Sequence, residues 1–114
     1  MATHESQLET QFHEAMLGIY EAAKRLKPPY PATRFLRMVQ EHGGRETANR
    51  LLATGDPSEG FTEHFLRGRD KLKISAEYLV LKNPWRELFT DDQRAVARKR
   101  LHDYECDPPP EDAA

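Results

Sequence analysis

Residues 35–55, FLRMVQEHGGRETANRLLATG, constrain the fold more than any other stretch of the chain. Apolar residues recur at helical spacing on both sides of the adjacent glycines Gly43 and Gly44. Glycine adopts the left-handed backbone that ends a helix, so we expect Gly43 to close the first helix and Gly44 to begin the second. Gly55, which precedes Asp-Pro, is expected to close the second helix. Helices this short are unstable alone in water, so the pair predicts the hub of a packed helical core.

Helical patterns continue on both sides of this pair. Residues 7–27 carry apolar side chains at helical spacing and would form the longest helix, about 30 Å in length. Residues 28–31, PPYP, are expected to end it as a stiff linker. A short helix over residues 61–68 should bury Phe61, Phe65 and Leu66.

Two segments near the C-terminus define the remaining helices. Residues 72–80 alternate apolar and polar side chains as a strand does, yet Ser75 before an apolar run resembles a capped helix. We prefer the helix, because the chain offers no second convincing strand to pair with. Residues 90–93, TDDQ, match a capping box and predict the start of the last helix.

These patterns predict an all-α protein, a single compact bundle of five to six short helices with a long N-terminal helix. Its 114 residues are enough for one hydrophobic core. We assign residues 1–106 to a single helical domain. Residues 107–114 are acidic and proline-rich and are expected to form a disordered tail. The residues expected to be buried are Phe35, Leu36, Val39, Leu51, Leu52, Phe61, Phe65 and Leu79.

The net charge of −2 conceals a strong segregation of charge along the chain. All 17 Lys and Arg residues lie within residues 24–100, which hold 10 acidic residues and therefore carry a net charge of +7. The segments before and after contain acidic residues and no Lys or Arg. Such a distribution bears on the choice of partner and not on the fold.

Two basic clusters suggest an anion-binding site. Residues 67–73, RGRDKLK, hold four bases and one acid, and the last helix adds further bases. Arginine matches phosphate with two parallel hydrogen bonds, so the ligand would be a nucleotide-type small molecule or a nucleic acid. Duplex DNA is the less favoured ligand, because the joint at residues 43–44 is too abrupt for a typical helix-turn-helix. The candidate residues are Arg67, Arg69, Lys71, Lys73, Arg98 and Arg100.

Patterns typical of catalysis and metal binding are sparse. His102 and Cys106 are spaced to share a helix face, but two ligands are fewer than zinc needs. The other histidines lack a metal-binding spacing, and we interpret all five as surface residues. Acidic neighbours are expected to raise the pKa of the Cys106 thiol. We therefore predict no catalytic residue, no metal and no cofactor, although carboxylates from distant segments could still assemble into an acid–base pair.

The sequence also bears on location. A single cysteine favours a reducing compartment, because it cannot form an internal disulfide. No stretch is apolar enough for a membrane span, and the N-terminus lacks the order of charged and apolar residues of a secretory signal. We expect a cytoplasmic protein that does not interact with membranes.

Short motifs follow one another along the chain in the order FLRMV, GG, TANRLL, GFTEHF, ISAEYLVL, LFT and ARKRL. In this succession the chain resembles a family of short bacterial proteins without assigned function, over roughly residues 12–104. The resemblance implies an all-helical domain and supplies no activity, cofactor or catalytic residue. In those relatives the segment that corresponds to RGRDKLK is less basic, which implies that the basic segment is particular to this chain.

Two functional predictions remain. The first is a small, non-catalytic helical module that binds a protein partner or a second copy of itself, with aromatic residues such as Tyr30 and Trp85 as anchors. A homodimer could use the apolar stripe of the first helix, although a stripe that faces the core is the more common case. The alternative is a binder of an anionic ligand through the basic residues.

Overall fold

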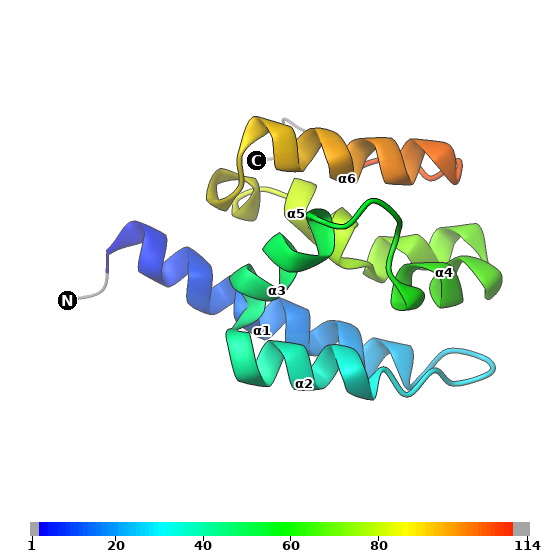
Figure 1. Ribbon diagram of the computed structural model, residues 1–114. Helices are drawn as coiled ribbons and strands as arrows, with labels where there is room; N and C mark the ends of the chain where they lie inside the picture. Colours follow the sequence, from blue (N-terminus) through cyan, green and yellow to red (C-terminus); the bar gives the residue numbers. More distant parts are fainter. Residues whose placement is uncertain (1–2, 111–114) are drawn as a thin grey trace.

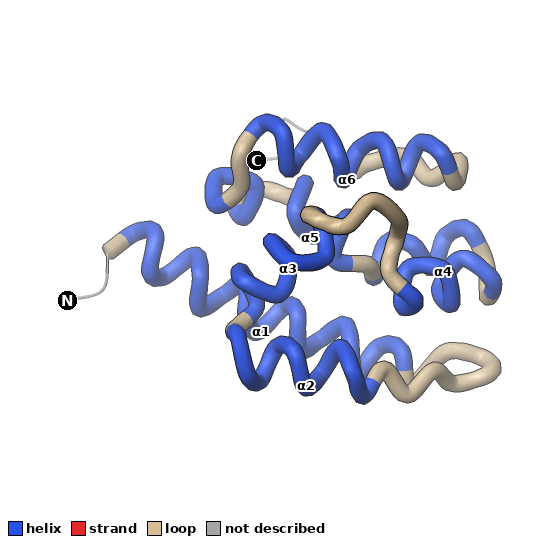
Figure 2. The backbone as a smooth tube through the Cα atoms, in the orientation of Figure 1, coloured by secondary structure: helices blue, strands red, loops and turns tan. Residues whose placement is uncertain are grey.

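Residues 3–110 are described by the computed structural model, and they form six α-helices and two 3-10 helices without a strand (Figure 1). The predicted all-α fold and the long N-terminal helix are therefore confirmed. Figure 2 shows that short loops connect most of the helices. Residues 111–114 of the predicted tail lie outside the described residues. The elements are α1 (His4–Ala23), α2 (Thr33–His42), α3 (Gly44–Leu52), α4 (Glu59–Leu66), η1 (Arg69–Ile74), α5 (Ala76–Leu81), η2 (Trp85–Leu88) and α6 (Asp91–Asp103).

The helices are arranged around the short helix α5. In Figure 1, α1 and α2 lie side by side on one side of the molecule and α6 lies on the opposite side, with α3 and α5 between them. The molecule measures 43 × 27 × 27 Å. Most of α5 is buried, because it contacts α1, α3 and α6 together with both 3-10 helices. The most enclosed element is therefore α5 and not the α2–α3 pair.

Helix α1 supplies the longest apolar stripe of the core. Leu8, Phe12, Met16, Ile19 and Ala23 are all buried at spacings of three or four residues. The ring of Phe12 packs edge-on against Trp85 and Phe89, with centroids 6.0 and 5.2 Å apart. The stripe that could have served a homodimer is thus used by the core, and self-association stays a prediction.

The joint between α2 and α3 uses its two glycines for different reasons. Gly43 has a φ of 85°, a backbone conformation that residues other than glycine rarely adopt. Gly44 lies against α1, where a Cβ atom would come within 2.7 Å of the Cα atom of His13. The predicted helix boundary is confirmed. The predicted end of α3 is wrong, because Ala53 caps the helix and Gly55 lies in the following loop.

Side-chain caps begin three of the remaining helices. The hydroxyl of Ser75 accepts a hydrogen bond from the Tyr78 amide, which confirms that α5 is a helix and not a strand. Thr90 and Gln93 form the predicted capping box at the start of α6. Ser58 caps α4 by accepting from the Phe61 amide. The basic segment RGRDKLK forms most of η1, with Leu72 buried beneath it.

The predicted core residues are buried to different degrees. Val39, Leu52, Phe61 and Leu79 are buried as expected. Phe35, Leu36, Leu51 and Phe65 are half-buried, and three of them, Phe35, Leu51 and Phe65, pack against the buried core. The prediction for Leu66 is wrong, since its side chain is 70% exposed. The buried face of α4 runs through Phe61 and His64, and Leu66 points away from it.

Candidate functional site

Two of the six predicted anion-binding residues are engaged inside the protein. The guanidinium of Arg67 donates to the carbonyl oxygens of Pro28 at 2.5 Å and Glu63 at 2.9 Å, and so ties the linker after α1 to α4. Arg100 is buried and donates to the carbonyl oxygens of Leu51 at 2.9 Å and Thr54 at 2.6 Å. These contacts cap the end of α3, where carbonyl groups lack helical partners.

The remaining predicted residues lie on two elements. Arg69, Lys71 and Lys73 share η1, where Arg69 is paired with Glu105 at 2.8 Å and Lys71 with Asp70 at 3.4 Å. Lys73 is exposed, and Arg98 is half-buried on α6. Three of the six residues therefore share η1, whereas Arg100 is buried in the core.

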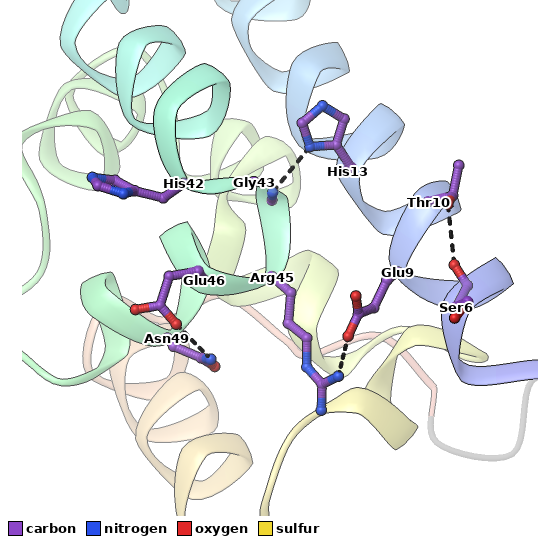
Figure 3. A pocket seen from close by; sticks show the side chains of 10 residues that line it. Ser6, Glu9, Thr10, His13, His42, Gly43, Arg45, Glu46 and Asn49 are labelled. Atoms are coloured by element: carbon purple, nitrogen blue, oxygen red, sulfur yellow. Dashed lines mark hydrogen bonds and ion pairs between the residues drawn. The ribbon is translucent and has the colours of Figure 1, made fainter. Parts of the chain in front are cut away.

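A polar cleft of about 560 Å³ lies where the start of α3 meets α1 (Figure 3). The Gly44 amide donates a hydrogen bond to Nδ1 of His13 at 3.0 Å. Arg45 is paired with Glu9 and with Glu5, at 2.6 Å for Glu5, and it also donates to the Leu88 carbonyl oxygen at 2.9 Å. The charged residues on the α1 side of the cleft thus hold α1, α3 and η2 together.

The histidines of this cleft do not converge. Figure 3 shows His13 and His42 on opposite sides of Gly43, with His42 pointing away from His13. Among residues 3–110, no three His, Cys, Asp or Glu side chains are grouped so that they could hold a metal ion. We interpret the polar cleft as the joint between α1 and α3.

A second hollow, the α2–α4 groove, is mainly apolar. It has a volume of about 210 Å³ and lies between α2 and the start of α4. Met38 and Phe35 from α2 and Leu51 from α3 supply apolar surface, and Arg34 and Glu59 are the charged residues. The lining residues are Tyr30, Arg34, Phe35, Met38, Leu51, Ser58, Glu59 and Gly60.

A small inner chamber of about 20 Å³ lies beside the groove. The two spaces share five lining residues, Tyr30, Phe35, Leu51, Ser58 and Gly60. A space of this size holds about one water molecule. The chamber is completed by Ile19, Ala32, Phe61, His64, Ser75, Ala76 and Glu77.

His64 lines this chamber and is 2% exposed. Neither of its ring nitrogens has a hydrogen-bond partner within the described chain. Burial is the main cause that lowers the pKa of His64 to about 4, and the nearby charge of Arg67 lowers it further. The imidazole is therefore neutral at pH 7, with one nitrogen as a donor and the other as an acceptor. The interpretation of all histidines as surface residues is wrong for His64.

The other polar groups of the chamber already have partners. The Ser75 hydroxyl donates to the Leu72 carbonyl oxygen at 2.6 Å and accepts from the Tyr78 amide. Glu77 accepts from Arg100 at 3.1 Å, although burial outweighs this contact and raises the pKa of the carboxyl group. In contrast, the two ring nitrogens of His64 have no hydrogen-bond partner within the described chain.

Tyr30 packs against His64 and lines both the groove and the chamber. Its ring packs edge-on against the imidazole with centroids 6.1 Å apart, and its hydroxyl donates to Glu59 at 3.4 Å. Burial and the adjacent Glu59 raise the pKa of Tyr30. The sequence offered Tyr30 as an anchor residue but gave no sign of the groove. The spacing of Phe61, His64 and Phe65 on one helix face was the signal for a buried histidine.

Comparison of the chain with protein-family models, with curated proteins and with solved structures found no match. The resemblance to short bacterial proteins therefore stays a prediction. Among the described helices, none is long and apolar enough to cross a membrane.

Proposed function

We propose that this protein is a helical binding module that holds an aromatic side chain of a protein partner in the α2–α4 groove. The observation that carries the proposal is the groove itself, a mainly apolar hollow lined by Tyr30, Phe35 and Met38. Apolar surface that remains hollow loses the contacts that a packed core provides, so an inserted side chain would be stabilising.

The size of the groove favours one side chain over a complete small molecule. Its volume of about 210 Å³ is below the 300–1,000 Å³ typical of ligand pockets. Interfaces between proteins, in contrast, often depend on one or two aromatic anchors seated in a pocket with a polar rim. Arg34 and Glu59 would supply such a rim, because both are exposed residues of the groove.

Anion binding remains the alternative function. The support for anion binding is that Arg69, Lys71 and Lys73, which are close in the sequence, share the helix η1. We prefer the groove because Arg67 and Arg100, two of the six candidate residues, already have partners inside the protein.

The test of the groove uses a pair of glycine variants. In Gly60→Ala the new methyl group would lie 3.9 Å from Cε2 of Tyr30 and 3.8 Å from Oγ of Ser58, so it narrows the groove without a clash. In Gly18→Ala, the matched control on α1, the methyl group would meet nothing within 4 Å. Both changes replace a helical glycine, so both should stabilise their helix slightly.

The experiment selects peptides from a displayed random library against the full chain and then measures their affinity for both variants. We expect peptides with an aromatic anchor, whose binding is weakened by Gly60→Ala and unchanged by Gly18→Ala. The absence of any aromatic selection, or equal binding by the two variants, would contradict the proposal.

A further inference from the structure

We propose that the inner chamber recognises a hydroxyl group, so that the preferred anchor is a tyrosine whose ring fills the α2–α4 groove and whose hydroxyl bonds to His64. This inference rests on the proposed function of the groove and specifies the chemistry of its occupant. The juxtaposition of a ring-sized hollow and an oxygen-sized chamber is its basis.

The two spaces are neighbours. They share the side chains of Tyr30, Phe35 and Leu51 as walls, and Gly60 removes side-chain bulk from the wall between them. The chamber of about 20 Å³ has room for about one oxygen atom and not for a second ring. Only a small terminal group of a ligand can therefore fit beside His64.

The hydrogen-bonding capacity of His64 identifies that group. A neutral imidazole presents one donor and one acceptor, and a phenolic hydroxyl can accept from the first or donate to the second. Buried polar groups are nearly always paired, so two unpartnered nitrogens on one side chain call for an external partner. A water molecule in the chamber is the competing partner, and the experiment below separates the two.

The charges around the chamber disfavour an anionic group. The chamber's lining includes the carboxyl group of Glu77 and neither Lys nor Arg. At the groove, Glu59 and Arg34 carry opposite charges and give no net attraction for an anion. A carboxylate or phosphate in the chamber would lose its water without gaining a cation from the lining, whereas a neutral hydroxyl carries a smaller penalty.

Side-chain analogues provide a direct test on the full chain. The probes are p-cresol, which corresponds to tyrosine, and toluene, which corresponds to phenylalanine, each titrated against the protein and followed by NMR. We expect both to shift the resonances of Gly60 and Phe35, with p-cresol binding about three- to tenfold more tightly, the effect of one hydrogen bond. The imidazole resonances of His64 should respond to p-cresol and much less to toluene.

The variant His64→Phe keeps a ring in the chamber and removes its hydrogen bonds. It should abolish the preference for p-cresol while toluene still binds, and the control His102→Phe, at an exposed position on α6, should leave the preference unchanged. In peptides selected against the protein, a Tyr→Phe change at the anchor should weaken binding by a similar factor.

The outcomes distinguish this inference from the proposed function. Equal affinity of the protein for p-cresol and toluene would overturn the hydroxyl site, with water as the partner of His64, and would leave the groove in place. A preference that survives in His64→Phe would also overturn it. If p-cresol, the more water-soluble probe, shifts no groove resonance at about 20 mM, the weak-binding range for a molecule of this size, the groove itself is rejected. If His64→Phe does not fold, the relative affinity of the unmodified protein for p-cresol and toluene still tests the hydroxyl site.

Discussion

Glu77 and Arg100 form an ion pair inside the protein, with Oε2 and Nη1 3.1 Å apart and the side chains 2% and 7% exposed. The same guanidinium reaches the carbonyl oxygens of Leu51 and Thr54, so α5, α6 and the end of α3 meet at one side chain. Arg100, which the sequence pattern assigned to a basic surface, is thus a structural residue of the core.

Removing Arg100 should destabilise the fold strongly. The change Arg100→Ala leaves Glu77 buried without its partner, and breaking a buried pair typically costs about 3–5 kcal/mol. Urea unfolding at pH 7 measures this loss. The control Lys99→Ala, at an exposed position on the same helix, should change the free energy of unfolding by no more than about 0.5 kcal/mol. A loss below about 1 kcal/mol for Arg100→Ala would show that the pair does not support the core.

Gly44 should tolerate no side chain. The Cβ of Gly44→Ala would lie 2.7 Å from Cα and 3.2 Å from N of His13, so the backbones of α1 and α3 must move apart. We expect a loss of about 1–3 kcal/mol, as found for overpacked cores. Gly18→Ala is the contrasting variant and should gain up to about 1 kcal/mol, because alanine is the better helix former. Thermal unfolding of both proteins provides the comparison, and a stable Gly44→Ala would mean that the joint is looser than described.

His64 should make the stability of the protein depend on pH. Its pKa in the fold is about 4, below the ordinary value of 6.5. As the pH falls, the unfolded chain takes up this proton near pH 6.5 and the folded chain only near pH 4. Stability is therefore complete above about pH 6.5 and declines by roughly 2–3 kcal/mol between there and pH 4. Urea unfolding at several pH values measures the decline.

The variant His64→Phe isolates this contribution from that of the carboxyl groups. The difference in unfolding free energy between the variant and the unmodified protein should widen in favour of the variant as the pH falls from 6.5 to 4. A difference that stays constant over this range would show that His64 is solvated in the fold. The variant should also be at least as stable at pH 7.5, because it removes two unpartnered polar atoms.

Two leucines test the assignment of the core. Leu52 is 6% exposed, and Leu52→Ala should cost about 2–5 kcal/mol. Leu66 is 70% exposed, and Leu66→Ala should change the free energy of unfolding by about 0.5 kcal/mol or less. Chemical denaturation of the two variants under one condition makes the comparison. Similar losses would contradict the orientation of α4.

The basic residues of η1 should not affect the groove. We expect the double change Arg69→Glu with Lys71→Glu to leave peptide binding unchanged, since neither residue lines the groove. The same variant, tested against a nucleotide panel and a mixed-sequence duplex, examines the alternative function. Binding of either ligand by the unmodified protein, lost on the double change and weakened by salt, would favour anion recognition instead.

Local signals in the sequence predicted the α-helices, although α1 ends at Ala23 and not at residue 27 as expected. The Gly43-Gly44 joint, the Ser75 cap and the Thr90 capping box each depend on residues within one turn of the backbone, so the sequence displays them directly. Helix ends set by tertiary contacts, such as the end of α3 where Arg100 caps the carbonyl groups, were placed less well.

The candidate site could not be predicted in the same way. Arg100 pairs with a residue 23 positions away, and its neighbours in sequence are bases that make it look like part of a solvated run. The groove around Tyr30 is formed by segments from four separate parts of the chain. Whether a histidine such as His64 is buried depends on which helix face turns inward, and charge and composition carry no information about that orientation.

The contact between α6 and the core also bears on the order of events during synthesis. Glu77 and the carbonyl groups of Leu51 and Thr54 emerge from the ribosome well before Arg100, which completes their hydrogen bonds. Until α6 has emerged, closing the core would enclose a carboxylate without its cation. We therefore expect the nascent chain to gain a stable fold only after α6 has formed.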